Sequence, residues 1–190
     1  MIEFKVNVEE NLPYDRKSYL SLFNWYGVSF QLPGVFEGES VSLNIYKSAY
    51  EQWFKNLISI YDNGLPWIIN HDFTDEAWFP NNEHNLLSLR KVFKKNNISN
   101  TFVGALVLAK EDLLELTEDI ITYPFSVFNK NSILYDNLDI SHSEFDFVVK
   151  ISAHMCIDVL STDKELLKKV VYENNSLGVF KVIEYQNTLL

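Results

Sequence analysis

Residues 46–69 read YKSAYEQWFKNLISIYDNGLPWII, and this stretch decides the fold class. From Tyr46 to Tyr61, apolar side chains recur every three or four positions and polar side chains fill the positions between them. This spacing predicts an amphipathic helix with one face against a core. Asn63 and Gly64 then form a helix stop, and Trp67 to Ile69 predict a buried strand. A long packing helix next to a strand favours a domain that combines helices with a sheet.

The C-terminal part of the chain predicts a second unit of the same kind. Phe145 to Ala153 and Met155 to Leu160 are apolar enough to form one or two strands. Thr162-Asp163-Lys164-Glu165 is a capping box that opens a helix, and Val179 to Tyr185 predict a final strand. This order of elements indicates a βαβ-like unit.

The rest of the chain predicts further short elements without a linker or an internal repeat. Alternating apolar and polar residues predict a half-buried strand at 2–8, and other patterns predict a strand at 28–32, a buried strand at 101–109, and helices at 15–26, 83–95 and 110–121. We therefore expect a single α+β domain over residues 1–190. It would have a mixed or mostly antiparallel sheet packed against about four to five helices.

The net charge disfavours some classes of binding partner. The 190 residues include 16 basic and 26 acidic side chains, for a net charge of −10. Only Arg16 and Arg90 are arginines, whereas nucleic-acid binding favours a concentrated basic face rich in arginine. An anionic membrane surface would repel the chain in the same way. We expect no nucleic acid and no membrane as a partner, and a basic protein as the favoured one.

The remaining composition predicts a cytoplasmic protein without a cofactor. Cys156 is the sole cysteine, which leaves no intramolecular disulfide and no cysteine zinc cluster. The N-terminus lacks a signal peptide, and no apolar run approaches the ~20 residues that a membrane span needs. The six glycines form no phosphate-binding loop, and there is no G-x-S-x-G motif. An enzyme is therefore the less favoured class.

Acidic residues are concentrated in two spans, 56–89 and 111–149, where basic residues are scarce. If the two spans meet in space, they would form a broad negative surface. The aromatic pair Trp78 and Phe79 lies inside the first span, and an aromatic anchor ringed by carboxylates is typical of a protein-binding patch. The candidate partner-binding residues are Asp72, Asp75, Glu76, Trp78, Phe79 and Glu83. The alternative is that Trp78 and Phe79 attach this segment to the core.

The same segment holds the candidate metal ligands, which are His71, Asp72, Glu83 and His84. Imidazoles and carboxylates are ligands for divalent metals, but their spacing here matches no established metal motif. The alternative is a solvated acidic loop that precedes a helix.

Three functions remain open. The first is a non-catalytic acidic protein-binding domain. In size and composition it is similar to the small acidic bacterial immunity proteins that neutralise toxic nucleases. The second is a metal-assisted hydrolase that uses the segment from His71 to His84. The third is a self-associating structural domain, in which residues 101–109 or 179–185 form an exposed edge strand that pairs with a second copy.

Overall fold

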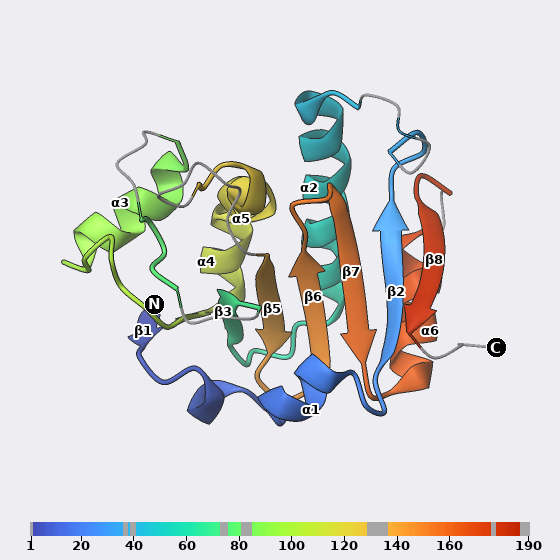
Figure 1. The fold of residues 1–190 in the computed structure, drawn as a ribbon, viewed down its shortest axis with the longest axis horizontal. Helices are drawn as coiled ribbons and strands as arrows, with labels where there is room; N and C mark the ends of the chain where they lie inside the picture. Colours follow the sequence, from blue (N-terminus) through green and yellow to red (C-terminus); the bar gives the residue numbers. More distant parts are fainter. Residues whose placement is uncertain are drawn as a thin grey trace.

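An eight-stranded antiparallel sheet organises the chain in the computed structural model (Figure 1). The structure describes residues 2–35, 38, 41–72, 76–80, 85–128, 137–175 and 178–186. The strands run in the order β1-β4-β3-β5-β6-β7-β2-β8. Their bounds are β1 Glu3–Lys5, β2 Tyr26–Gln31, β3 Trp67–His71, β4 Ala105–Leu108, β5 Leu138–His142, β6 Phe147–Ile151, β7 Cys156–Ser161 and β8 Lys181–Gln186.

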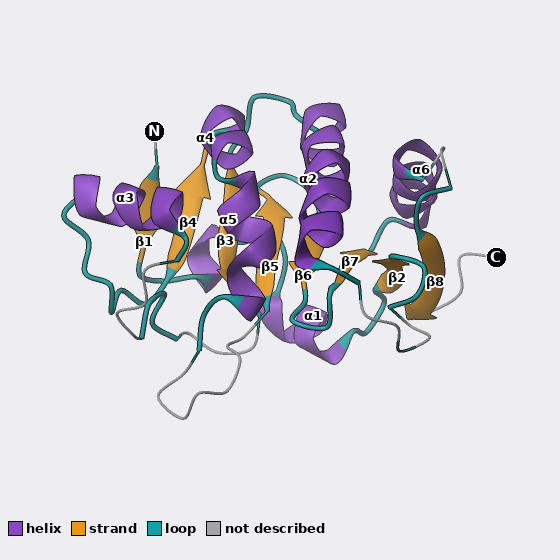
Figure 2. Cartoon of the chain, turned by 90° about the horizontal axis from the view of Figure 1, so that it is seen from above, coloured by secondary structure: helices purple, strands orange, loops and turns teal. Residues whose placement is uncertain are grey.

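Helices cover one face of the sheet almost completely. The described residues form α1 Arg16–Ser21, α2 Leu43–Ile60, α3 Leu87–Lys95, α4 Lys110–Glu115, α5 Thr117–Thr122 and α6 Lys164–Asn174. Figure 2 shows α2 to α6 on one side of the sheet and α1 on the other. Short 3₁₀ turns occupy Glu9–Asn11 and Tyr123–Phe125. The α+β fold with an antiparallel sheet is thus confirmed.

The central helix α2 forms as its periodicity predicts. The side chain of Ser42 accepts a hydrogen bond from the Ile45 amide and caps the first turn. Its core-facing side chains are all buried, and they are Tyr46, Tyr50, Trp53, Phe54, Leu57 and Ile58. They pack on apolar side chains that alternate along β2, β3, β5, β6 and β7, so the main core lies between α2 and the sheet.

The C-terminal unit is βαβ-like, and its two strands are separated by β2, which comes from the N-terminal part of the chain. Strands β7 and β8 both pair antiparallel with β2, so they run parallel to each other on either side of it. Helix α6 connects them, and Asp163 caps it by accepting hydrogen bonds from the amides of Glu165 and Leu166. Strand β2 therefore provides the backbone partner for both β7 and β8.

Residues 12–25, here called the N-terminal strap, include α1 and lie across part of the second face of the sheet (Figure 1). The Tyr14 hydroxyl hydrogen bonds to Ser141 Oγ at 2.8 Å, and Arg16 donates to the His71 carbonyl at 3.1 Å. Tyr19 and Trp25 are buried in a small cluster with Val148 and Leu160. The strap covers only part of this face, at its lower end in Figure 1.

Several predicted elements differ from the structure. The helix predicted at 15–26 is limited to Arg16–Ser21, because Leu22 and Asn24 have positive φ angles. The strand predicted at 101–109 is limited to Ala105–Leu108. Strand β1 is limited to Glu3–Lys5, because Val6 is 77% exposed and the chain leaves the sheet there. The predicted helix at 110–121 is divided into α4 and α5 at Leu116. Among the residues that the structure describes, no helix is both long enough and apolar enough to cross a bilayer.

Candidate functional site

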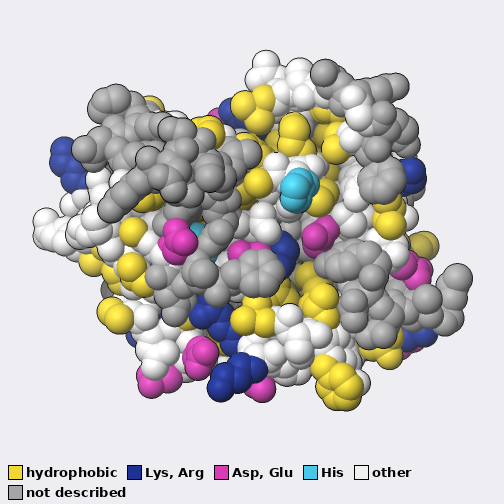
Figure 3. Space-filling model, viewed as in Figure 1, with side chains coloured by type: hydrophobic (Ala, Val, Ile, Leu, Met, Phe, Trp, Pro, Cys, Tyr) yellow, Lys and Arg dark blue, Asp and Glu magenta, His cyan; other side chains and the backbone are white. Residues whose placement is uncertain are grey.

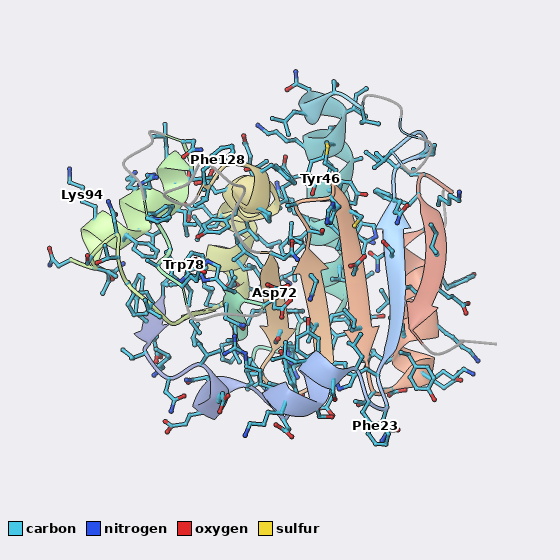
Figure 4. The ribbon with its side chains drawn as sticks, viewed as in Figure 1. Phe23, Tyr46, Asp72, Trp78, Lys94 and Phe128 are labelled. Atoms are coloured by element: carbon cyan, nitrogen blue, oxygen red, sulfur yellow. The ribbon has the colours of Figure 1, made fainter. Side chains whose placement is uncertain are left out.

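The predicted aromatic anchor lies in the core. Trp78 is 0% exposed and Phe79 is 2% exposed. The Trp78 indole donates to the Gly104 carbonyl at 2.9 Å, and its ring packs edge-on against Tyr123. Figure 4 shows Trp78 within the body of the protein. Both side chains attach this segment to the core, as the alternative prediction for them stated.

Those of the predicted acidic and metal-ligating residues that the structure describes are dispersed. Asp72 is 1% exposed and forms an ion pair with Lys150 at 3.1 Å. His71 faces the opposite side of the sheet, where its Nε2 atom lies 3.0 Å from the Tyr123 hydroxyl. Adjacent strand residues alternate between faces, so His71 and Asp72 do not converge on one ligand. Glu76 is half-buried, and Asp75, Glu83 and His84 lie outside the described residues.

The two acidic spans do meet, at the lower end of the sheet in Figure 1. The amide of Ser143 donates to the Pro66 carbonyl at 3.1 Å, and the Asn63 amide group hydrogen bonds to Glu144. Several acids of these spans are compensated elsewhere, since Glu118 pairs with Lys47 and Asp72 with Lys150. The meeting point therefore carries a local acidic surface rather than a broad one.

Four connections converge at this end, and we call their carboxylates the acidic loop end. The four connections are residues 22–25, which lead into β2, and residues 61–66, 143–146 and 161–165, of which the last three are linked in turn by contacts. Thr162 donates from its amide and its hydroxyl to Asp146, and the Lys164 ammonium lies 5.8 Å from the Tyr26 ring centroid. The carboxylates of the acidic loop end are those of Asp62, Glu144, Asp146, Asp163 and Glu165.

Neutralisation of this surface is partial. Lys110 pairs with Asp62 at 3.1 Å, and the hydrogen bond from Lys110 lowers the pKa of Asp62. Lys168 pairs with Glu165 at 3.1 Å. Within the described part of the chain, Glu144, Asp146 and Asp163 form hydrogen bonds but no ion pair. A net negative potential is therefore left at the end of the sheet.

Two apolar side chains are exposed among these carboxylates. Phe23 is 70% exposed and Leu65 is 42% exposed. Leu22 and Asn24 on either side of Phe23 have φ angles of 55° and 62°, which non-glycine residues seldom adopt. This backbone turns Leu22 toward the Tyr19 and Trp25 cluster and leaves Phe23 outside, as Figure 4 shows. The turn holds an aromatic side chain in solvent at some conformational cost.

His142 joins two of the connections. Its Nδ1 atom accepts from the Glu144 amide at 3.1 Å, so its Nε2 atom carries the proton and donates to Asn63 Oδ1 at 3.0 Å. The ring stacks on Phe145 with centroids 4.6 Å apart. Burial lowers the pKa of His142, although Glu144 and Asp62 oppose that effect. The imidazole is thus neutral and fixes residue 63 against residue 144.

Exposed apolar side chains and carboxylates thus lie together at this end of the sheet. No protein-family model matches the chain, and comparisons with curated proteins and with solved structures give no match. The site must therefore be interpreted from its own residues. Sequence reasoning located Asp62, Glu144 and Asp146 within acidic spans but gave no sign that Phe23 and Leu65 lie beside them.

Proposed function

We propose that this chain is a non-catalytic binding protein for a basic protein partner, and that the acidic loop end meets that partner. The observation that carries the proposal is the convergence of carboxylates with Phe23 and Leu65 at one end of the sheet. Protein interfaces commonly centre on a few aromatic or apolar anchors, while charged residues around them select the partner and accelerate association.

The net charge of −10 supports the same class of partner, because it favours encounter with a basic protein at low ionic strength. Neutralisation of a toxic basic protein, in the manner of bacterial immunity proteins, is the specific form that we propose. A cytoplasmic location belongs to that proposal.

Complex formation with basic proteins encoded beside its gene tests the proposal. We expect an association rate that falls as salt rises from about 20 to 200 mM, since exposed charges are screened over about 10 Å at 0.1 M. Glu144→Lys should slow association, and Phe23→Ala should speed dissociation. Glu111→Lys makes the same charge change at an exposed position on α4 and should affect binding little.

Two results would count against this assignment. One is the failure of every basic neighbour to bind at low salt. The other is a complex that Glu111→Lys weakens while Glu144→Lys and Phe23→Ala leave it unchanged, because the partner would then occupy the helical face.

A second candidate function, self-association, is favoured by the position of β8. Among the described residues this strand pairs only with β2 and lies at one edge of the sheet, whereas β4 is interior. A strand at the edge of a sheet can be extended by a strand of a second copy. Light scattering over a concentration series should show a dimer if β8 is used in this way, and a constant monomer mass excludes it.

For the metal-assisted hydrolase, the structure offers no assembled centre in the part that it describes. Within these residues, no group of three or more His, Cys, Asp or Glu side chains is arranged to hold a metal ion. Glu83 and His84 are outside that part, so a role for them stays a prediction.

A further inference from the structure

The upper half of the sheet face that carries the strap is entirely polar on its five central strands. Cross-strand neighbours form one row of Asn70, Asp139, Lys150, Asp158 and Ser29. A second row, two residues further along each strand, consists of Asp72, Asn137, Ser152, Cys156 and Gln31. We call these ten residues the polar half-face. Figure 3 shows acidic and basic side chains close together near the centre of this side of the molecule, and Figure 4 places Asp72 there.

Asp139 is the anomalous member of the polar half-face. It is 1% exposed, and neither of its carboxyl oxygens has a hydrogen-bond partner. The Asn70 Oδ1 atom on the neighbouring strand is buried and also unpartnered. A buried polar atom normally finds a partner, since leaving one unpaired costs about 1–3 kcal/mol and an unpaired charge costs more. Asp139 and Asn70 therefore bring more buried hydrogen-bond acceptors together than there are donors bonded to them.

The nearby donors are engaged elsewhere. Lys150 donates to Asp72 Oδ2 at 3.1 Å, and Asn137 donates to the same atom at 3.1 Å. The Asn70 amide group donates to the His71 carbonyl at 2.7 Å. The Tyr19 hydroxyl makes no hydrogen bond of regular geometry, but it lies close enough to Asp139 to act as a donor and lower the pKa of that carboxyl. A proton on Asp139 supplies the missing donor and removes a buried charge.

We propose that the N-terminal strap is a latch that a proton on Asp139 holds shut and that loss of this proton opens. The strap borders Asp139, because Tyr14 bonds to Ser141 two residues along β5, the Tyr19 ring centroid lies 5.5 Å from the Lys150 ammonium, and Tyr19 and Arg16 both influence the pKa of Asp139. An ionised Asp139 would be a buried carboxylate whose neighbouring cation, Lys150, is already bonded to Asp72. Opening the strap admits water to it, and the opening is opposed by a small apolar cluster and by the hydrogen bonds of Tyr14 and Arg16.

The charges around Asp139 come from three sides. Asp72 faces it from the end of β3, Lys150 from β6, and Arg16 with Tyr19 from the strap. Burial raises the pKa of Asp139 to about 7, Asp72 adds to the rise, and Lys150, Tyr19 and Arg16 oppose it. For Lys150, burial acts to lower the pKa, but Asp139 and Asp72 outweigh it and the pKa rises. Lys150 therefore stays charged while Asp139 titrates.

A carboxyl-resolved NMR titration of the full chain, paired with hydrogen exchange of residues 14–25, tests the latch. The Asp139 carboxyl should titrate near neutral pH. Strap protection, corrected for intrinsic exchange, should fall about ten-fold per pH unit above that point, because one proton controls one opening. Asp139→Asn should remove this dependence. Asp158 lies in the same row, and the residues that influence its pKa do not include a strap residue, so Asp158→Asn should retain the pH dependence of strap protection.

Ser141→Ala provides a second arm that leaves Asp139 in place. It removes the bond to Tyr14, loosens the strap and should lower the pKa of Asp139. Titration of Asp139 below pH 5 in the wild-type chain overturns the latch. So does strap protection that is independent of pH while Asp139 titrates near neutrality, because Lys150 would then have moved from Asp72 to the new charge. Both readouts are independent of any partner, so failure of the proposed binding function leaves this test intact.

Discussion

Substitution of Asp139 by asparagine should stabilise the protein at alkaline pH, although it removes a charged group from the structure. Burial raises the pKa of Asp139 from 3.8 to about 7, so the folded state holds this proton more tightly than the unfolded state. The resulting stability is complete below pH 3.8 and is lost as the pH rises through 7. Each pKa unit corresponds to about 1.4 kcal/mol, and the whole shift to about 4 kcal/mol.

Urea denaturation of wild type and Asp139→Asn between pH 4 and pH 8 measures this difference. The variant should gain on the wild type by up to about 4 kcal/mol across that range, because asparagine cannot ionise. Glu111→Gln, an exposed acid-to-amide change on α4, should track the wild type throughout. A constant difference between Asp139→Asn and the wild type at every pH would refute the reasoning, since the carboxyl would then be ionised in both states.

Three further predictions follow from buried contacts. Trp78→Phe keeps a ring in the core but leaves the Gly104 carbonyl without its donor, and urea denaturation should show a loss of about 1–3 kcal/mol; an unchanged midpoint would contradict the assigned bond. Gly104→Ala should cost about 1–3 kcal/mol and deprotect the amide of Lys5 in hydrogen exchange, because Gly104 has a φ of 141° and a Cβ there would lie 2.2 Å from the Lys5 carbonyl oxygen. Acidification from pH 7 to pH 5 should destabilise residues 61–66 and 143–146, since burial lowers the pKa of His142 and the unfolded state takes up its proton first; equal exchange protection at both pH values would argue against this role.

The fold was largely predictable because its main elements have strong local signals. The 3.6-residue period of α2 survives in the structure, and the capping box before α6 differs only in that Asp163 rather than Thr162 is the N-cap. The weak predictions were those that depended on tertiary context. The alternation over 2–8 is that of a strand, but only Glu3–Lys5 finds a partner, in β4. The sequence of the first eight residues contains no information about where that partner ends.

The candidate site was much less predictable. Trp78 and Phe79 stand in a polar stretch, and composition alone does not tell whether such aromatics point into the core or into solvent. Phe23 and Glu144 lie far apart in the chain and are at the same end of the sheet only because β2, β7, β6 and β5 are neighbours. Lys150 and Asp158 each interrupt an apolar strand, which is typical of a solvent-facing position. Their alignment with Asp139 follows from strand register, which the local pattern leaves open.

Phe23 belongs to the same N-terminal strap that borders Asp139, and this has a thermodynamic consequence. A partner that binds Phe23 would stabilise the closed strap and would thereby raise the pKa of Asp139. Coupling between two binding events is reciprocal, so protonation of Asp139 would raise the affinity for the partner by the same factor. Above neutral pH, complex formation would then absorb hydrogen ions from the medium. Calorimetric heats measured in buffers with different ionisation enthalpies would reveal that uptake directly.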